Sequence, residues 1–208
     1  MLVPKIYPIT DTTLSGVSHL EQVKALLEGG ARMIQIRDKN MSSRELFGAI
    51  EECNVMVRDY DAKLIVNDRV DITMALRADG VHLGQDDLPP VEARKLLGPR
   101  AIIGFSTHSV EQAIKAMELP VDYIAAGPIF PTWSKTDPEP MIGLAGLKRI
   151  RQAIGDFPLV AIGGIRNLDN CRDVLSAGAD SVAMISALVS KPLQITNRMR
   201  KALEIASN

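Results

Sequence analysis

The sequence is poor in cysteine, carries almost no net charge and has no long apolar run. Cys53 and Cys171 lie far apart without the spacing of metal ligands, which favours a reduced compartment over a disulfide framework. The formal net charge is -1, so there is no electrostatic footprint for nucleic acid. No apolar run approaches membrane-spanning length, and residues 1–10 lack a signal-peptide layout. We therefore expect a cytoplasmic protein without nucleic-acid or membrane partners.

Short apolar runs alternate with amphipathic segments along the whole chain. The composition, 46% hydrophobic and 24% charged over 208 residues, is typical of one globular domain with a sizeable core. Eight apolar runs are predicted to be strands: 6–9, 33–36, 64–66, 81–83, 101–105, 123–126, 159–162 and 182–185. Between them, apolar residues recur at three- and four-residue spacing, which indicates helices, the last over about residues 193–206.

Several predicted helices carry start signals in their first turn. Ser42 with Glu45, and Ser109 with Gln112, each fit a capping box. Residues 89–90 are a proline pair, which suits the first turn of the helix that follows Asp87. These signals support the alternation of strands and helices.

Strands that alternate with helices predict a parallel sheet, because parallel neighbours need a crossover connection. Eight such units in about 200 residues match an α/β protein with a single (β/α)8 TIM barrel over residues 1–208. A doubly wound open sheet is the structural alternative. The first predicted strand is not followed by a GxGxxG turn, which weakens the dinucleotide-binding form of that alternative.

In such a barrel the chemistry takes place at the carboxyl ends of the strands. Polar or glycine residues follow nearly every predicted strand, at 35–39, 67–69, 84–87, 106–108, 132–135, 163–164 and 186. These segments converge on one rim if the barrel closes. The pattern therefore predicts a polar site there.

Each segment also has a purely structural explanation. The pairs 67–68 and 86–87 could cap the following helices, and Arg37 and Lys39 could be ordinary exposed charges. The glycine pair 163–164 could be a tight turn, but after the seventh strand it favours phosphate binding through backbone N–H groups.

The three histidines are not predicted to be catalytic. His82 lies on a predicted strand and is expected to be a packed or hydrogen-bonded core residue. His19 and His108 are expected to be exposed.

The combination of charges is more informative than any single residue. Asp68 and Asp87 offer two hard oxygen ligands from adjacent strand ends, as in the sparse sites where Mg²⁺ shares its ligands with phosphates. Positive charge and phosphate-binding groups are predicted around the same rim: Arg37, Lys39, Lys135, Gly164 and Ser186. No Ser-His-Asp arrangement, CxxC pair or histidine cluster accompanies them. We expect electrostatic stabilisation of a leaving diphosphate.

The segment 125–135 begins as a strand and continues into a long loop. Thr132, Ser134 and Lys135 supply two hydroxyls and a cation, groups expected around phosphate oxygens, and Trp133 is the only tryptophan. Long loops in compact domains are often functional lids, although this one could also be a solvated surface loop.

The motifs together resemble the thiamine phosphate synthase family. They cover nearly the whole chain and are QIRDK at 35–39, VND at 66–68, GVHLGQDDLP at 80–89, GFSTH at 104–108, GPIFPTWSK at 127–135 and AIGGI at 161–165. The resemblance implies a transferase that couples hydroxymethyl-methylpyrimidine diphosphate to hydroxyethylthiazole phosphate, giving thiamine phosphate and pyrophosphate. It also implies Mg²⁺ as cofactor and a dissociative mechanism with a pyrimidine-methyl cation.

The resemblance assigns a role to each matching residue. The pyrimidine diphosphate is expected to contact Gln35, Ile36, Arg37, Asp38, Lys39, Asn67, Ser106 and Lys135. The thiazole phosphate is expected to contact Thr132, Trp133, Ser134, Gly164, Ile185 and Ser186. Asp68 and Asp87 are expected to bind Mg²⁺, and the catalytic residues to be Arg37, Lys39, Ser106 and Lys135.

Two departures from the family pattern fall in the loop, where Trp133 replaces a smaller or non-aromatic residue and Ser134 replaces threonine. Serine keeps the hydroxyl, and the Trp133 ring is expected to help close the loop over the thiazole.

Other functions stay open at this point. One is a thiazole tautomerase of the same superfamily, for which we would expect a catalytic histidine where Pro128 and Ile129 stand. The others are a different phosphate-binding barrel enzyme and a non-catalytic barrel that only binds a phosphate ligand. The sequence also leaves the oligomeric state open, a homo-oligomer included.

Overall fold

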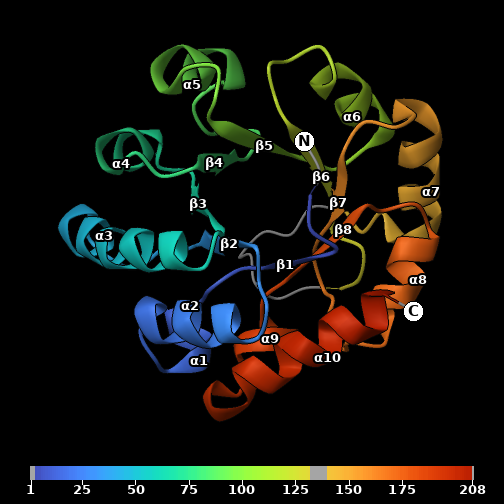
Figure 1. The fold of residues 1–208 in the computed structure, drawn as a ribbon. Helices are drawn as coiled ribbons and strands as arrows, with labels where there is room; N and C mark the ends of the chain where they lie inside the picture. The colour runs from blue at the N-terminus through green and yellow to red at the C-terminus, as the bar shows by residue number, and fades with distance from the viewer. Residues whose placement is uncertain (1–2, 132–139, 208) are drawn as a thin grey trace.

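Parallel strands of one sheet curl into a barrel, seen end-on in Figure 1. The computed structural model describes residues 3–131 and 140–207. Within these residues the strands are β1 (Ile6–Pro8), β2 (Met33–Ile36), β3 (Lys63–Asn67), β4 (Gly80–Leu83), β5 (Ile102–Thr107), β6 (Tyr123–Ala126), β7 (Leu159–Ala161) and β8 (Ser181–Met184). Their order is β1-β8-β7-β6-β5-β4-β3-β2, and a parallel bridge between Ile9 and Gln35 joins the two end strands. The predicted (β/α)8 barrel is confirmed.

Helices form a ring around the outside of the strands (Figure 1). In the described part of the chain they are α1 (Thr12–Ser15), α2 (His19–Glu28), α3 (Ser43–Asp59), α4 (Val70–Leu76), α5 (Pro90–Leu97), α6 (Val110–Ala116), α7 (Gly143–Ile154), α8 (Asn170–Ser176), α9 (Ser186–Val189) and α10 (Ile195–Ser207). The last helix starts later than predicted because Pro192–Gln194 form a separate 3-10 turn. Strand β5 is longer than predicted because Ser106 and Thr107 continue the pairing with Ala125 and Ala126 of β6.

The predicted capping signals are confirmed in part. At α3, Ser42 accepts the backbone N–H of Glu45, and the Glu45 side chain accepts the N–H of Ser42, so the capping box is complete. At α6, Ser109 accepts the N–H of Gln112, but the Gln112 side chain accepts the N–H of His108 at 2.6 Å. The proline pair 89–90 lies at the start of α5 as predicted.

Two hydrophobic cores hold the barrel, one between the sheet and the helices and one inside the sheet. Side chains alternate along each strand, so Met33 and Gln35 of β2 point inward while Ile34 and Ile36 join the outer core. Tyr7 of β1 and Tyr123 of β6 are the largest residues of the inner core, and both are essentially inaccessible to water. Their rings fill the barrel below its carboxyl end.

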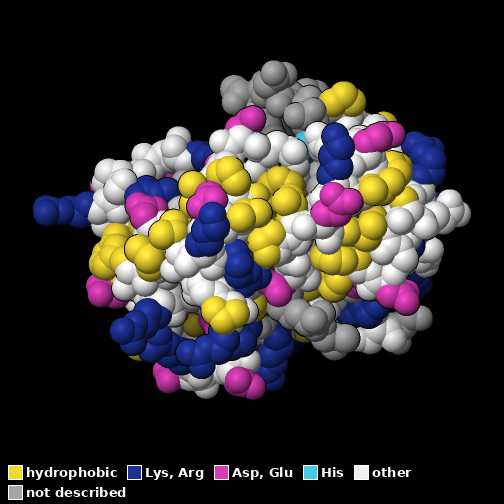
Figure 2. All heavy atoms as spheres, turned by 90° about the horizontal axis from the view of Figure 1, so that it is seen from above, with side chains coloured by type: hydrophobic (Ala, Val, Ile, Leu, Met, Phe, Trp, Pro, Cys, Tyr) yellow, Lys and Arg dark blue, Asp and Glu magenta, His cyan; other side chains and the backbone are white. Residues whose placement is uncertain are grey.

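The outer surface carries mixed charge. Figure 2 shows acidic and basic side chains distributed over one face with apolar side chains between them, as the near-zero net charge implies. None of the described helices is long and apolar enough to cross a membrane.

Gly104 of β5 has no side chain, and this leaves room for the Tyr123 ring. A Cβ atom at Gly104 would lie 2.0 Å from Cζ of Tyr123 and 2.3 Å from its hydroxyl oxygen, distances that no packed structure tolerates. Gly104 pairs with Tyr123 in the β5–β6 register, so neither strand can move away without breaking the sheet.

We predict that Gly104→Ala lowers the free energy of unfolding by about 1–3 kcal/mol or more, because the added methyl overpacks the inner core. Gly48→Ala in α3 is the matched control, since a Cβ there meets nothing within 4 Å. That control is expected to stabilise the helix by about 0.5–1 kcal/mol. Urea denaturation measures both, and a Gly104→Ala variant as stable as wild type would contradict this packing.

Candidate active site

A cavity opens at the carboxyl ends of the strands. Its lining comes from strand ends and the turns that follow them: Ile9, Gln35, Arg37, Asn67, His82, Ser106, His108, Gly127, Pro128, Ile162, Gly163, Gly164, Ile165, Arg166, Ala183, Ile185 and Ser186. This is the end of a (β/α)8 barrel where active sites are found. The structure thus brings together seven of the predicted site residues in one cavity: Gln35, Arg37, Asn67, Ser106, Gly164, Ile185 and Ser186.

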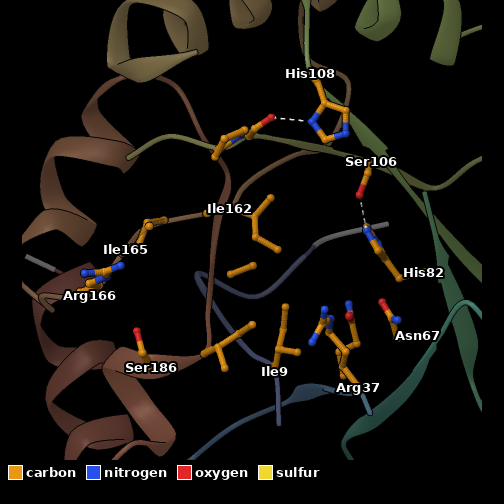
Figure 3. A pocket seen from close by; sticks show the side chains of 17 residues that line it. Ile9, Arg37, Asn67, His82, Ser106, His108, Ile162, Ile165, Arg166 and Ser186 are labelled. Carbon is orange, nitrogen blue, oxygen red and sulfur yellow. Dashed lines mark hydrogen bonds between the residues drawn. The ribbon is translucent and has the colours of Figure 1, made fainter. Parts of the chain in front are cut away.

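The cavity has two polar ends with apolar side chains between them (Figure 3). Arg37, Asn67 and Ser106 lie on one side, and Arg166 and Ser186 lie on the other. Apolar side chains such as Ile9 and Ile162 separate these ends. A ligand pair with a polar group at each end and rings in the middle fits this distribution.

The segment 35–39 divides its side chains between the cavity and the scaffold. Gln35 is buried, donates from Nε2 to the Tyr7 hydroxyl at 3.0 Å and lines the cavity beside Arg37. Ile36 points the other way into the outer core and does not line the cavity. Asp38 also does not line it.

The Asp38 carboxylate organises the turn that carries Arg37 and Lys39. It accepts the Thr12 hydroxyl at 2.7 Å and the backbone N–H groups of Asn40 and Met41 at 2.8 and 2.9 Å. Burial by itself raises the pKa of Asp38, but these hydrogen bonds outweigh burial and the pKa is lowered overall. The ionised form of Asp38 therefore holds the turn.

His19 is buried, and the expectation of an exposed histidine was wrong. It is 1% exposed, with Nδ1 2.8 Å from the Thr10 hydroxyl and Nε2 3.3 Å from Oδ2 of Asp38. Burial lowers its pKa more than the Asp38 carboxylate raises it. The sequence did not reveal this because His19 opens a helix whose buried face is defined only by its packing on the barrel.

Asp68, Asp87 and Lys39 form a charged cluster beside the cavity. The ammonium of Lys39 pairs with the carboxylate of Asp68. Asp87 accepts the N–H of Gly84 at 2.7 Å. Burial raises the pKa of Asp87, and its contact with the Asp68 carboxylate raises it further. The two predicted metal ligands are therefore neighbours, as their positions on adjacent strand ends require.

The capping explanation for these carboxylates was wrong. Helix α4 begins after Arg69 and helix α5 after Pro89, and neither start has a side-chain cap. Asp68 has a φ of 60°, a conformation uncommon for a residue other than glycine, and its N–H bonds the carbonyl of His82 at 2.9 Å. The side chains of Asp68 and Asp87 therefore do not cap these two helices.

Side chains at the carboxyl ends of β4 and β5 line or support the same side of the cavity. His82 behaves as predicted: it is a hydrogen-bonded core residue, and its Nε2 is 2.9 Å from Oγ of Ser106. His108 was expected to be exposed, but its Nδ1 is 2.7 Å from the carbonyl of Gly127 and it lines the cavity (Figure 3). The side chain of Gln85 donates to the carbonyl of Ser106 at 2.5 Å.

The glycine pair after β7 cannot be replaced by other residues without strain. Gly164 has a φ of 72°, and a Cβ there would lie 2.2 Å from the carbonyl oxygen of Phe130. Gly163 accepts the N–H of Phe130 at 3.0 Å, so this turn packs tightly against the segment that follows β6. Close backbone packing leaves the turn lining the cavity next to Ser186.

Four predicted site residues, Thr132, Trp133, Ser134 and Lys135, lie outside the described residues.

Within the described ranges, no group of three or more His, Cys, Asp or Glu side chains could hold a metal ion. Two carboxylates suit Mg²⁺, which keeps several waters and takes its remaining oxygens from substrate phosphates. The donor set therefore fits a magnesium ion shared with a phosphorylated ligand.

The sequence did not identify Tyr7 and Tyr123 as neighbours of the cavity or Arg166 as a lining residue, whereas His108 lies in a strand-end segment that was predicted to reach the rim. The tyrosines lie within apolar runs, where they read as ordinary core residues. Strand alternation could have found Tyr7, because it precedes the inward-facing Ile9 by two positions. Arg166 follows closely after the glycine pair, and a cation at that place was the available signal.

Fold and cavity together define a (β/α)8-barrel protein with a polar pocket at the carboxyl ends of its strands, a layout used for phosphorylated small molecules. The family model described as thiamine monophosphate synthase matches residues 6–188. The chain belongs to the thiamine monophosphate synthase family, as the sequence motifs predicted.

Individual relatives agree with this assignment. The chain is 47% identical over 189 residues to a thiamine-phosphate synthase of Methanospirillum hungatei, covering 90% of each chain. It resembles the solved structure of thiamine phosphate pyrophosphorylase from Pyrococcus furiosus with a TM-score of 0.85 and 41% identity, over 98% of this chain and 97% of that one. A tryptophan synthase alpha-subunit from the same organism, at 14% identity and a TM-score of 0.70 over 97% and 98% of the two chains, shows the shared fold alone.

The buried pair of His19 and Asp38 predicts how stability depends on pH. The pKa of His19 in the folded protein lies below its ordinary value of 6.5. The stabilisation of the fold by neutral His19 is therefore complete above pH 6.5 and is lost as the pH falls below 6.5. We expect the free energy of unfolding to fall by up to about 1.4 kcal/mol per pH unit on this account.

Urea denaturation at about pH 7.5 and about pH 5.5 measures this loss in wild type and in His19→Gln. The variant is expected to lose less stability than wild type between the two pH values. An equal loss in both proteins would show that His19 does not carry the dependence.

Proposed function

We propose that the protein is a cytoplasmic transferase that joins hydroxymethyl-methylpyrimidine diphosphate to hydroxyethylthiazole phosphate, releasing pyrophosphate. Relatives named thiamine-phosphate synthase support this reaction over most of the chain and confirm the predicted class of enzyme at the level of the family. The observation that carries the proposal is one cavity with two polar ends and an apolar middle (Figure 3). It suits two phosphorylated ligands whose rings meet between them.

The pyrimidine diphosphate occupies the side formed by β2, β3 and β5. Gln35 and Ser106, which line the cavity, contact the ring, and Arg37 and Asn67 contact the diphosphate. Lys39 reaches the same phosphates from its place beside Asp68. Asp38 acts through the turn that its carboxylate holds, and Ile36 anchors that turn in the outer core.

Asp68 and Asp87 would hold Mg²⁺ at this rim. Bound there, the ion would supply positive charge that offsets the charge of a leaving pyrophosphate. Burial raises the pKa of Asp87, and the neighbouring Asp68 carboxylate raises it further, because the two groups repel each other when both are ionised. Lys39 offsets that repulsion when no diphosphate is present.

The thiazole phosphate occupies the opposite side. Gly164, Ile185 and Ser186 line the cavity there, and the glycine turn presents backbone to the ligand. Thr132, Trp133, Ser134 and Lys135 are proposed to complete the two ligand sites from the loop after β6.

The chemistry is a substitution at the methylene carbon of the pyrimidine. The carbon–oxygen bond breaks first and its electron pair leaves with pyrophosphate, while Arg37, Lys39 and Lys135 stabilise the departing charge. The thiazole nitrogen then donates its lone pair to the pyrimidine-methyl cation and forms the carbon–nitrogen bond. That nitrogen carries no proton to remove, so the residues bind, orient and stabilise charge without a general base.

An assay for pyrophosphate release tests the proposal, with both substrates and Mg²⁺ present and with each omitted in turn. Release that requires all three components is the expected result. Binding of the thiazole phosphate without any pyrophosphate release would instead favour the tautomerase or the non-catalytic barrel.

The metal assignment predicts a specific defect in Asp87→Asn. Removing one of two ligand carboxylates is expected to raise the Mg²⁺ concentration for half-maximal rate by about tenfold or more. Asp86→Asn is the matched control, because Asp86 is the exposed neighbour in the same turn. A titration of rate against Mg²⁺ compares the two variants, and an unchanged requirement in Asp87→Asn would remove it from the metal site.

A further inference from the structure

A line of buried polar side chains crosses the barrel interior from Gln35 to Ser106. Gln35 Nε2 donates to the Tyr7 hydroxyl at 3.0 Å, and that hydroxyl is 3.1 Å from the hydroxyl of Tyr123. The Tyr123 hydroxyl is 3.0 Å from Nδ1 of His82, and Nε2 of His82 is 2.9 Å from Oγ of Ser106. The two ends of the line, Gln35 and Ser106, both line the cavity.

With the Gln35 amide as placed, the hydrogen bonds in this line take one consistent direction. An amide nitrogen only donates, so the Tyr7 oxygen accepts from Gln35 and its single proton goes on to Tyr123. The Tyr123 proton then goes to Nδ1 of His82, which requires the neutral ring with its proton on Nε2. That proton is donated to Ser106, whose own hydroxyl proton remains for the cavity.

We propose that Tyr7, Tyr123 and His82 are positioning residues that set the direction of hydrogen bonding at both ends of the line. They turn Ser106 into a donor toward the cavity, and they leave the carboxamide oxygen of Gln35 as an acceptor. This inference rests on the proposed function. Ser106 and Gln35 together recognise the edge of an aminopyrimidine ring, which presents an acceptor ring nitrogen next to a donor amino group.

The three positioning side chains are held too tightly to reorient. Tyr7, Tyr123 and His82 are at most 5% exposed, and the Tyr7 and Tyr123 rings pack edge to face with centroids 6.0 Å apart. His82 stacks on Tyr123 at 5.6 Å with 21° between the ring planes. Gly104 leaves only enough space for the Tyr123 ring beside it. Burial raises the pKa of both tyrosines, so each phenol keeps the proton that it donates.

The opposite direction makes a distinct prediction for His82. If the Gln35 amide were rotated by half a turn, every bond in the line would reverse and the His82 proton would move to Nδ1. Ser106 would then be an acceptor and Gln35 a donor toward the cavity, which matches an aminopyrimidine edge only with its ring nitrogen and amino group exchanged between the two residues. The tautomer of His82 therefore reports the direction of the whole line.

Long-range ¹H–¹⁵N correlation spectra of the free, full-length protein read this tautomer directly. The chain has three histidines, and His82→Gln assigns the signal by its disappearance. We expect a neutral ring with the proton on Nε2. A proton on Nδ1, or on both nitrogens at neutral pH, would overturn the proposal.

Kinetics of Tyr7→Phe and Tyr123→Phe test the consequence for binding. Each change cuts the line and is expected to raise KM for the pyrimidine diphosphate about three- to tenfold, the effect of one lost hydrogen bond. KM for the thiazole phosphate is expected to stay within about twofold, which a general loss of packing would not predict. Tyr60→Phe, which removes the hydroxyl of the remaining tyrosine outside the inner core, is the matched control.

Tyr7 and Tyr123 lie on different strands, so one variant can still be measured if the other fails to fold. Unchanged KM values in both variants, or equal increases for the two substrates, would overturn the positioning role. The His82 tautomer is measured without substrate, so this test of the proposal is independent of turnover. Absence of pyrophosphate release with the expected tautomer would refute the proposed reaction and leave the direction of the line in place.

Discussion

The closure of the sheet between β1 and β2 is the constraint on which the rest of the structure depends. Ile9 pairs with Gln35, and the N–H of Thr10 donates to the carbonyl of Gln35 at 2.9 Å. Side chains alternate along parallel strands, so this closure sets which residues face inward around the ring. Tyr7 is thereby placed under Gln35, and its ring and that of Tyr123 form a solid floor. The two tyrosine rings fill the barrel interior and so form the lower boundary of the cavity.

Charge at the rim follows from the same geometry. Adjacent strand ends bring Asp68 and Asp87 together, an arrangement that burial and mutual repulsion make unfavourable unless a cation lies near. Lys39 supplies that cation in the structure, and its turn is held by Asp38 through hydrogen bonds to backbone and side chain.

Local patterns were sufficient to predict much of this protein, and tertiary packing explains the remainder. Strand periodicity located the barrel and the strand ends, including Asp68 and Asp87, because both depend on short-range sequence order. His19 was misjudged because the buried face of its helix is defined by packing on the barrel, where it meets Asp38, a residue 19 positions away in the sequence. The link from Tyr7 to Tyr123 was not predictable in the same way, since it joins residues 116 positions apart inside the barrel.

We propose that Asp68 and Asp87 bind a divalent ion whose coordination is completed by diphosphate oxygens. Electron paramagnetic resonance titration of Mn²⁺, as a substitute for Mg²⁺, tests this directly in the presence and absence of pyrophosphate. We expect weak binding of Mn²⁺ alone, binding at least about tenfold tighter with pyrophosphate, and loss of the tight mode in Asp68→Asn. Equal Mn²⁺ binding with and without pyrophosphate, or tight binding that survives in Asp68→Asn, would contradict it.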